Sequence, residues 1–454
     1  MDDYYKFLDS KRQLSGEYGF SPVYMPDQAF DFQKSLIEWA CVKGRSAIFA
    51  DCGLGKSLMQ LAWAQNVVQK TNKNVLILTP LAVSHQTVKE GAKFGIECAK
   101  SSDGSVKSKI TVTNYERLHY FNSNDFVGVV CDESSILKNF DGKIKSQVTE
   151  FLRTIQFRLP CTATAAPNDF IELGTTAEAL GHMGFMDMIG RFFKKTGSTT
   201  SRKDENRSGI YNLKGHAKKD FWRWVVSWSR ALRKPSDLGF EDFNHSLPDL
   251  ITRQHVVQCR SKNPDYLFDM PAFGLQEQRA ERSRSVGERC EMAAGIINSK
   301  PSSALAWCYL NKESEMLKSL IDGAEEVRGS DSDEKKEESF EAFEKGQIKC
   351  LVTKPTIAGF GLNWQHCNRM TFFPSHSFEQ WYQSIRRCWR FGQKSNVTVD
   401  LITSEGELDV LRNLKRKTDQ AEEMFSKMVG LMRNELNIKT IDNHKTKIEL
   451  PSWL

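Results

Sequence analysis

The chain has 454 residues, of which 40% are hydrophobic and 26% are charged, and its formal net charge is +6. This length predicts two or three domains, and the composition is typical of a globular protein rather than a disordered one. The sequence lacks the apolar run of about 18 residues that a membrane-spanning helix needs. Its 11 cysteines are scattered without the spacing of a zinc module or a disulfide framework. We therefore expect a cytoplasmic protein with reduced thiols and no membrane partner.

Two series of short apolar, β-branched runs alternate with helical patterns along the chain. Runs of this kind are typical of buried parallel strands, and strands that alternate with helices predict α/β units with right-handed crossovers. The first series covers residues 47–50, 74–80, 110–116, 127–133 and 157–164. The second series covers residues 303–310, 348–355, 369–373 and 397–403. We therefore predict an α/β fold with two lobes, each built on a parallel sheet flanked by helices.

The composition between these series suggests where the lobes begin and end. The predicted N-terminal lobe covers residues 1–250 and carries a basic, helical insertion at about 185–240. Residues 251–274 are proline-containing and are the predicted connection between the lobes. The predicted C-terminal lobe covers residues 275–454 and ends in a helical tail.

The segment "AIFADCGLGKSLMQLAWA" has the order of features that a phosphate-binding loop requires, namely a strand, a glycine-rich turn, Lys-Ser and a helical pattern. Gly53 and Gly55 would let backbone N–H groups close around phosphate oxygens, and the helix behind them points its N-terminus at the same place. Lys56 would reach the β- and γ-phosphates, and the Ser57 hydroxyl would bind magnesium. Ala50 replaces the first glycine of the strict pattern. The alternative is an ordinary strand-to-helix turn.

The apolar run "VGVVCDESS" brings two carboxylates to the end of a predicted strand. In a parallel α/β sheet, ligands bind at the carboxyl ends of the strands. Asp132 would then hold magnesium, and Glu133 would orient an attacking water. Acidic residues end many strands, so the simpler interpretation is a solvated strand end. The pair gains weight because it follows a phosphate loop at a plausible distance.

The predicted insertion combines basic and aromatic residues. Between residues 191 and 234 there are 13 Lys/Arg and 3 Asp/Glu, which indicates a polyanionic partner. Trp222, Trp224 and Trp228 either stack on bases among these cations or pack in the protein. Apolar residues of 221–232 recur at helical spacing, which is typical of a helix that buries one stripe. We favour packing for the tryptophans.

The segment "QSIRRCWRFGQ" places Arg386, Arg387 and Arg390 within five positions. Arginines this dense repel one another unless an anion lies among them. The anion is either a nucleotide or the backbone of a nucleic acid that lies along a basic helix face, and the residues alone leave both alternatives open.

Five segments in order resemble motifs I, II, III, V and VI of superfamily-2 helicases and translocases, namely "ADCGLGKS", "DESS", "TATAAPND", "TIAGFGLNWQ" and "QSIRRCWRFGQ". The ending "RRCWRFGQ" resembles the chromatin-remodeller-like branch, and the compact layout resembles phage-encoded members, which would act in the host cytoplasm. The resemblance covers roughly residues 25–425. It implies two tandem RecA-like lobes that face each other across ATP.

The resemblance also assigns roles to single residues. Gln33 matches the glutamine that recognises the adenine base in such enzymes. Thr162 and Thr164 match motif III, which couples the state of the bound nucleotide to nucleic-acid binding. Arg387 and Arg390 match the arginines that reach the γ-phosphate from the second lobe, and three positions apart on a helix they would share one face. Motif II reads Asp-Glu-Ser-Ser here, which puts in doubt only the coupling role of its fourth residue.

These features predict an ATP-dependent DNA helicase or double-stranded DNA translocase that uses magnesium. The alternatives are an ATP-dependent RNA helicase, and a nucleic-acid-binding module of the same fold without turnover. Single- or double-stranded DNA is the expected partner, RNA is less favoured, and proteins of replication, recombination or DNA processing are candidate further partners.

The expected site residues fall into three groups. The catalytic residues are Lys56, Asp132, Glu133, Arg387 and Arg390. The ATP contacts are Gln33, Gly53, Leu54, Gly55, Lys56, Ser57, Gly361 and Asn363, and the magnesium ligands are Ser57 and Asp132. The nucleic-acid contacts are Thr162, Thr164, Lys194, Lys195, Arg202 and Lys203.

Overall fold

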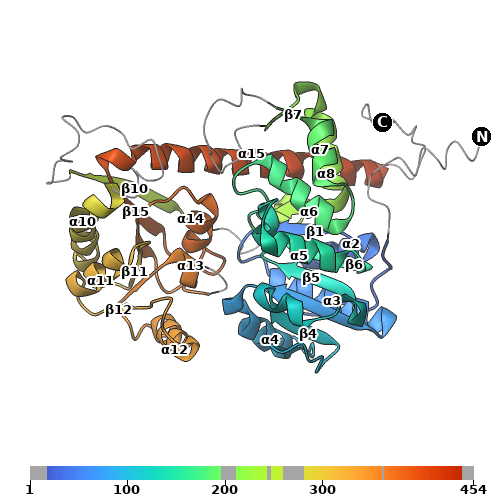
Figure 1. The fold of residues 1–454 in the computed structure, drawn as a ribbon, viewed down its shortest axis with the longest axis horizontal. Helices are drawn as coiled ribbons and strands as arrows, with labels where there is room; N and C mark the ends of the chain where they lie inside the picture. Colours follow the sequence, from blue (N-terminus) through green and yellow to red (C-terminus); the bar gives the residue numbers. More distant parts are fainter. Residues whose placement is uncertain (1–17, 196–210, 243–246, 259–280, 360–361, 442–454) are drawn as a thin grey trace, which may run out of the picture. The chain divides into compact units, whose positions relative to one another are not determined.

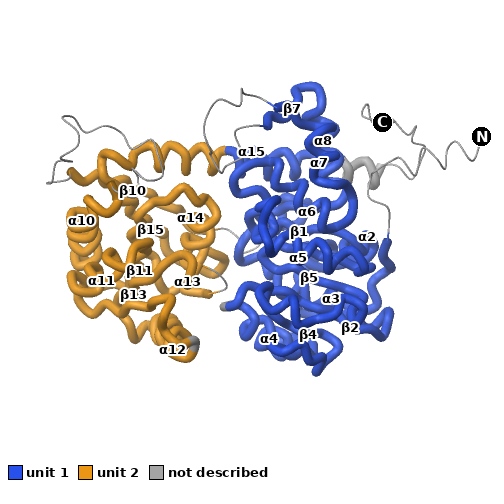
Figure 2. The backbone as a smooth tube through the Cα atoms, in the orientation of Figure 1, with its two compact units in different colours: residues 1–242, 420–454 blue, residues 243–419 orange. Residues whose placement is uncertain are grey.

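The computed structural model describes residues 18–195, 211–242, 247–258, 281–359 and 362–441 (Figure 1). The chain divides into two compact units, one of residues 1–242 with 420–454 and one of residues 243–419 (Figure 2). Each unit contains a sheet of parallel strands with helices packed along it. The predicted α/β fold with two parallel sheets is therefore confirmed.

Unit 1 is built on a seven-stranded sheet in the order β3-β4-β2-β5-β6-β1-β9. Neighbouring strands pair in parallel. The strands are β1 (Ala47–Ala50), β2 (Asn74–Thr79), β3 (Ala99–Lys100), β4 (Ile110–Asn114), β5 (Phe126–Asp132), β6 (Phe157–Cys161) and β9 (Ser229–Leu232). The helices are α2 (Asp31–Lys43), α3 (Lys56–Thr71), α4 (Ser84–Lys93), α5 (Lys143–Leu152), α6 (Leu173–Leu180), α7 (Phe185–Phe192) and α8 (Lys218–Trp228).

Strand β2 illustrates why apolar runs form the centre of this sheet. Successive side chains of a strand point to opposite faces, so a strand covered on both faces must be apolar throughout. Val75 and Ile77 pack in one core together with residues of α2 and α3. Leu76 and Leu78 pack in a second core together with residues of α5.

The predicted insertion contains α7, α8 and an antiparallel pair of short strands, β7 (Phe193–Lys195) and β8 (Tyr211–Leu213). In Figure 1 these elements lie together at one end of unit 1. Trp222, Trp224 and Trp228 are all buried, so the prediction that they pack in the protein is confirmed. The helix ends at Trp228, and the residues after it form β9, so the helical spacing to residue 232 was misleading.

Unit 2 is built on a six-stranded sheet in the order β10-β15-β14-β11-β13-β12, again with parallel pairings. The strands are β10 (Leu250–Val257), β11 (Ala304–Trp307), β12 (Ala324–Glu326), β13 (Cys350–Thr353), β14 (Arg369–Phe372) and β15 (Val397–Ser404). The helices are α10 (Val286–Asn298), α11 (Asn311–Leu320), α12 (Asp333–Glu344), α13 (Pro355–Ala358) and α14 (Phe378–Ile385).

The predicted lobe boundaries differ from this structure in two places. The connection expected at 251–274 begins with most of β10, which pairs with β15 over its whole length. Helix α15 (Leu408–Ile441) was expected to be a tail of the second lobe, but its residues from 420 onward belong to unit 1. Met424, Met428 and Met432 recur every fourth residue and pack in the core of unit 1, as one stripe of a helix does. Among the described helices, none is long and apolar enough to cross a membrane.

A buried ion network holds α10 and α11 together in unit 2. Arg289 Nη2 lies 2.8 Å from Glu313 Oε1, and both side chains are fully buried. Glu313 Oε2 also accepts hydrogen bonds from the backbone N–H groups of Tyr309 and Leu310, at 2.8 and 2.9 Å. Glu313 thus neutralises a buried guanidinium and caps the start of α11.

We expect Glu313→Ala to lower the free energy of unfolding by about 3–5 kcal/mol, because it removes the carboxylate nearest to the buried charge of Arg289 and leaves only that of Glu407, at 3.8 Å. Urea denaturation followed by tryptophan fluorescence measures this loss. The control is Glu341→Ala, which removes an exposed pair with Lys345 on α12 and should cost about 0.3–0.5 kcal/mol. Equal effects of the two substitutions would contradict a structural role for the buried pair.

Candidate nucleotide-binding site

The predicted phosphate loop joins β1 to α3 in unit 1. The four residues of β1 are buried, and the chain then turns through Gly53 at φ 90° and Gly55 at φ 75° before α3 begins at Lys56. Residues that carry a side chain rarely adopt these positive φ values. At Gly55 a Cβ atom would also lie 2.3 Å from Gln33 Nε2. The turn therefore favours glycine at position 55, and a side chain there would displace the amide of Gln33.

The turn presents backbone N–H groups that have no acceptor in the protein. In the part of the chain that the structure describes, the N–H groups of Gly53, Gly55, Lys56 and Ser57 donate no hydrogen bond. The first N–H groups of a helix lack intrahelical partners, and the helix dipole adds a partial positive charge at the same end. Together they form a cradle that suits an anion such as a phosphate group.

Lys56 adds a full positive charge beside this cradle. Its Nζ donates to the carbonyl oxygens of Ala50, at 3.0 Å, and Asp51, at 3.4 Å. Among the described residues no carboxylate oxygen lies within 4.0 Å of this ammonium group. Two neutral carbonyls orient the ammonium group without cancelling its charge, so it remains able to attract phosphate.

The acidic pair lies at the carboxyl end of β5, which neighbours β2 and β6 in the sheet. Asp132 Oδ1 accepts a hydrogen bond from Gln60 Nε2 at 2.6 Å, and the Asp132 carbonyl accepts one from Tyr115 Oη at 2.6 Å. Burial, followed by the charge of Glu133, raises the pKa of Asp132 to about 7. A divalent cation would oppose both effects because it favours the ionised carboxylate.

Glu133 is held in an unusual backbone conformation next to motif III. It has φ 47° and ψ 51°, a left-handed conformation that is uncommon for residues other than glycine and is often found at functional sites. Its Oε2 accepts a hydrogen bond from Thr162 Oγ1 at 3.3 Å, and Thr162 Oγ1 accepts one from the Thr164 backbone N–H at 3.0 Å. Both threonines are buried, and Thr162 contacts the acidic pair through Glu133.

Gln33 of α2 lies against the phosphate loop. Its Nε2 donates to the Leu54 carbonyl at 2.9 Å, and its Oε1 accepts from the Phe30 backbone N–H at 2.9 Å. A side-chain amide has two N–H groups and two oxygen lone pairs, so each end keeps the capacity for one further hydrogen bond. The structure thus brings Gln33 to the loop and gives it a role in holding the loop's backbone.

The arginine motif lies in unit 2, in the turns that follow α14. Arg387 Nη1 and Arg390 Nη1 both donate to the Leu362 carbonyl, at 3.1 and 3.0 Å. Arg387 Nε also donates to the Gln383 carbonyl at 2.9 Å. Because α14 ends at Ile385, the two arginines do not share a helix face as predicted. They converge instead through one acceptor in the motif V segment.

Arg386 is directed away from this pair. Its Nη2 donates to Tyr382 Oη at 3.2 Å, and its guanidinium lies 4.3 Å from the centre of the Trp389 ring. Burial, followed by the charges of Arg390 and Arg387, lowers its pKa to about 9. Arg386 therefore packs between aromatic rings as a structural residue.

Three of the predicted site residues lie outside the described part of the chain, namely Gly361, Arg202 and Lys203. Lys194 and Lys195 of β7 are exposed. The remaining nucleotide residues of unit 1 lie together at the carboxyl edge of its sheet, whereas Asn363 and the arginines belong to unit 2.

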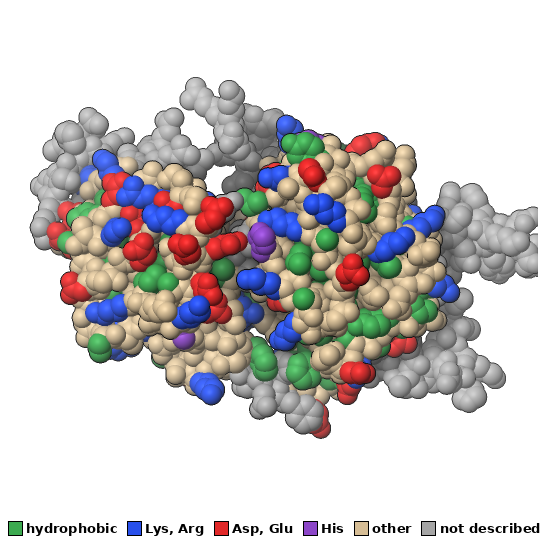
Figure 3. Space-filling view, turned by 90° about the horizontal axis from the view of Figure 1, so that it is seen from below, with side chains coloured by type: hydrophobic (Ala, Val, Ile, Leu, Met, Phe, Trp, Pro, Cys, Tyr) green, Lys and Arg blue, Asp and Glu red, His purple; other side chains and the backbone are tan. Residues whose placement is uncertain are grey.

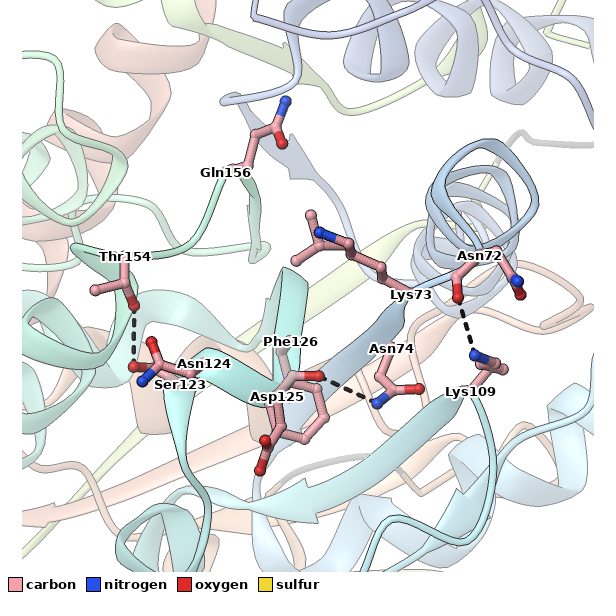
Figure 4. A pocket seen from close by; sticks show the side chains of 11 residues that line it. Asn72, Lys73, Asn74, Lys109, Ser123, Asn124, Asp125, Phe126, Thr154 and Gln156 are labelled. Atoms are coloured by element: carbon pink, nitrogen blue, oxygen red, sulfur yellow. Dashed lines mark hydrogen bonds between the residues drawn. The ribbon is translucent and has the colours of Figure 1, made fainter.

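A polar pocket of about 480 Å³ lies at the opposite edge of the unit 1 sheet (Figure 4). Asn74 and Phe126, the first residues of β2 and β5, line it. Figure 4 shows amide, hydroxyl and lysine side chains around it, with Lys109 directed at the Asn72 carbonyl. Ligands of parallel α/β sheets bind at the carboxyl ends of the strands, so this pocket is separate from the candidate nucleotide site.

No protein-family model and no curated protein matches the sequence. The SWI2/SNF2 ATPase core of Sulfolobus solfataricus in complex with dsDNA aligns with 93% of this chain and 99% of its own, at 18% identity and a TM-score of 0.42. The ATP-dependent Type ISP restriction-modification enzyme LlaBIII bound to DNA aligns with 87% of this chain at 12% identity and a TM-score of 0.55.

The chain therefore shares its overall fold with LlaBIII. At these identities the likeness extends to the fold alone, and this chain spans only 30% of the LlaBIII chain. The phosphate loop and the acidic pair occupy the carboxyl edge of a parallel sheet, which is where ligands of α/β folds bind. The N–H cradle, Lys56, the Ser57 hydroxyl and the Asp132 carboxylate are a donor set that fits a magnesium nucleotide.

Proposed function

We propose that the protein is an ATP-dependent DNA helicase or double-stranded DNA translocase. The observation that carries this proposal is the cluster at the carboxyl edge of the unit 1 sheet. There, backbone N–H groups without protein acceptors and the ammonium group of Lys56 lie in the loop after β1, and Asp132 and Glu133 lie at the end of β5, where Asp132 is bonded to α3 through Gln60. This combination of an anion cradle and an acidic pair suits phosphoryl transfer from a nucleoside triphosphate.

Each residue of the cluster has a separate role in the proposed reaction. The N–H groups of residues 53–57 and Lys56 bind the phosphates, and Ser57 and Asp132 hold magnesium. When bound, the magnesium ion neutralises charge on the β- and γ-phosphate oxygens. Glu133 orients the attacking water, and the hydrogen bond from Thr162 fixes the carboxylate that does so.

Arg387 and Arg390 are proposed to stabilise the charge that develops on the γ-phosphoryl oxygens. Both guanidinium groups donate to one neutral carbonyl, that of Leu362, and could exchange it for a doubly charged acceptor. A guanidinium group offers two parallel N–H donors to phosphate oxygens. In this proposal Asn363 and Gly361 contribute to the same nucleotide, and ATP closes the two lobes on each other.

DNA is the proposed partner, and the insertion is its proposed binding surface. LlaBIII, which shares the fold, is an ATP-dependent enzyme that was solved bound to DNA. Lys194 and Lys195 are exposed in a segment with a large excess of Lys/Arg. On the face shown in Figure 3, in contrast, acidic and basic side chains are intermixed. An RNA helicase is the alternative proposal, and it lacks a comparable observation in its favour.

An ATPase assay with purified protein tests the proposal. We expect slow hydrolysis without nucleic acid and marked stimulation by DNA. Single- and double-stranded DNA and RNA of equal length are added at the same nucleotide concentration. Stimulation by RNA alone would favour the alternative, and ATP binding without hydrolysis under every condition would identify a binding module.

The proposed DNA surface predicts a specific dependence on salt. Each contact between a cation and a phosphate contributes about −0.9 to the slope of log affinity against log salt concentration. Replacement of Lys194, Lys195, Arg202 and Lys203 by alanine should therefore make the slope less steep by up to about 3–4. Fluorescence anisotropy of a labelled duplex at several salt concentrations measures this slope.

A matched control removes the same charge from a region outside the insertion, at the edge of the unit 1 sheet where strands β2 and β4 begin. Lys70, Lys73, Lys107 and Lys109 are exposed and lie near the amino ends of β2 and β4. Their replacement by alanine should leave the slope almost unchanged. Equal slopes for the two fourfold variants would mean that the insertion does not contact DNA.

A further inference from the structure

Gln60 is a buried polar residue on the helix that begins at the phosphate loop. It lies on α3 three positions after Ser57, so both residues project from one side of the helix. Its neighbours Leu58, Met59 and Leu61 are apolar and buried. A fully buried amide costs free energy unless it is hydrogen-bonded. We therefore expect the buried amide of Gln60 to form a hydrogen bond with another polar group.

That partner is the carboxylate of Asp132. Gln60 Nε2 lies 2.6 Å from Asp132 Oδ1, and the two residues are 72 positions apart in the chain. A carboxylate only accepts hydrogen bonds, so the nitrogen of the amide must face it. The hydrogen bond joins α3, which carries Lys56 and Ser57, directly to the end of β5. Asp132 is also opposite Cys161 in the pairing of β5 with β6, so it belongs to the last paired position of the strand.

We propose that Gln60 is a positioning residue for the magnesium site. It fixes Oδ1 of Asp132 and thereby directs Oδ2 to the metal ion or its water shell, next to the Ser57 hydroxyl. Outer-shell partners that orient a ligating carboxylate contribute substantially to metal affinity. This inference rests on the proposed function, because it assumes that Asp132 and Ser57 are the magnesium ligands.

The test separates metal-dependent from metal-independent nucleotide binding. The affinity for a fluorescent ADP analogue is measured at equilibrium, once with excess magnesium and once with EDTA. Gln60→Met keeps the length of the side chain and removes the hydrogen bond. We expect it to reduce the affinity measured with magnesium by about 10- to 100-fold, whereas the affinity in EDTA stays close to that of the wild type.

Asn66 provides a matched control on the same helix. It is also a fully buried amide, but its hydrogen bonds go to the backbone of Val23, Tyr24 and Ala62, remote from the acidic pair. Asn66→Leu should lower the thermal stability and leave the ratio of the two affinities unchanged. If Gln60→Met does not fold, Gln60→Leu replaces it, because it is also apolar and cannot donate a hydrogen bond to Asp132.

The outcomes distinguish this inference from the proposed function. An unchanged ratio in Gln60→Met or Gln60→Leu, or an equal loss of affinity with and without magnesium, would overturn the positioning role and leave the nucleotide site intact. If the wild-type protein itself bound the analogue equally well in magnesium and in EDTA, or did not bind it, the result would contradict the proposed function and not only the role of Gln60. A selective loss with magnesium, absent in Asn66→Leu, supports the positioning role.

Discussion

Lys56→Ala is expected to abolish ATP hydrolysis together with nucleotide binding, whereas Glu133→Gln should abolish hydrolysis and leave nucleotide binding intact. The difference follows from their positions. Lys56 Nζ lies over the phosphate loop, bonded to the Ala50 carbonyl at 3.0 Å, whereas Glu133 lies at the end of β5, bonded to Thr162. Loss of the cradle charge weakens the grip on the phosphates, and loss of the carboxylate removes only the group that orients water.

We expect the hydrolysis rate to fall by at least about 10²–10³ in each variant, the usual effect of removing one preorganised catalytic group. ATPase rates and equilibrium binding of a nucleotide analogue are measured on the same preparations. Lys70→Ala is the control, because Lys70 is an exposed lysine at the other end of α3. Near-native hydrolysis in both Lys56→Ala and Glu133→Gln would show that the site has been assigned wrongly.

The second large effect is expected from the arginines of unit 2. An arginine that reaches the γ-phosphate of a nucleotide is worth about 10³–10⁵ in rate in well-studied hydrolases. We therefore expect losses of this size in Arg387→Ala and Arg390→Ala. Arg387→Lys should remain severely impaired, because lysine keeps the charge and loses the two parallel N–H donors. The affinity for DNA without nucleotide should change little.

The opposing hypothesis is that Arg387 and Arg390 bind the phosphodiester backbone of DNA. It predicts weakened DNA binding and preserved basal hydrolysis, so the same two measurements on the same variants decide between the two anions. Arg412→Ala is the control, since Arg412 is exposed on α15 and paired with Asp409. Preserved hydrolysis together with lost DNA binding would reject the nucleotide as the ligand of these arginines.

The sequence predicted the nine strands that lie in the interior of the two sheets, with neighbours on both sides. Each of the nine predicted runs contains or overlaps a strand of the structure, because a continuous apolar, β-branched run has few other ways to bury both faces. Strand β10 escaped prediction because it is at the edge of its sheet and Ile251, Thr252, Arg253 and Gln254 are exposed. Strand β9 escaped because its four residues continue a helical spacing that ends at Trp228.

The candidate site was predictable where its residues are neighbours in sequence. The phosphate loop and the pair of Asp132 and Glu133 are local patterns, and the structure places both at the same edge of one sheet. Gln60 and Tyr115 were missed because they reach Asp132 only in the folded chain, Gln60 from α3 and Tyr115 from the turn that follows β4, which is separated from β5 by β2. A buried glutamine in an otherwise apolar stretch of helix was the one available signal. The turns that carry Arg387 and Arg390 could not be foreseen from a spacing that also fits a helix.

The most direct test of the proposed function is the displacement of a third strand from duplex DNA. A translocase that moves along the duplex removes a bound triplex-forming oligonucleotide, which is followed by gel electrophoresis or fluorescence. We predict displacement that requires ATP and magnesium and is absent in Glu133→Gln, with strand separation of a forked duplex as the corresponding assay for a helicase. Hydrolysis of ATP without displacement or strand separation on any DNA substrate would contradict coupling between ATP hydrolysis and movement along DNA.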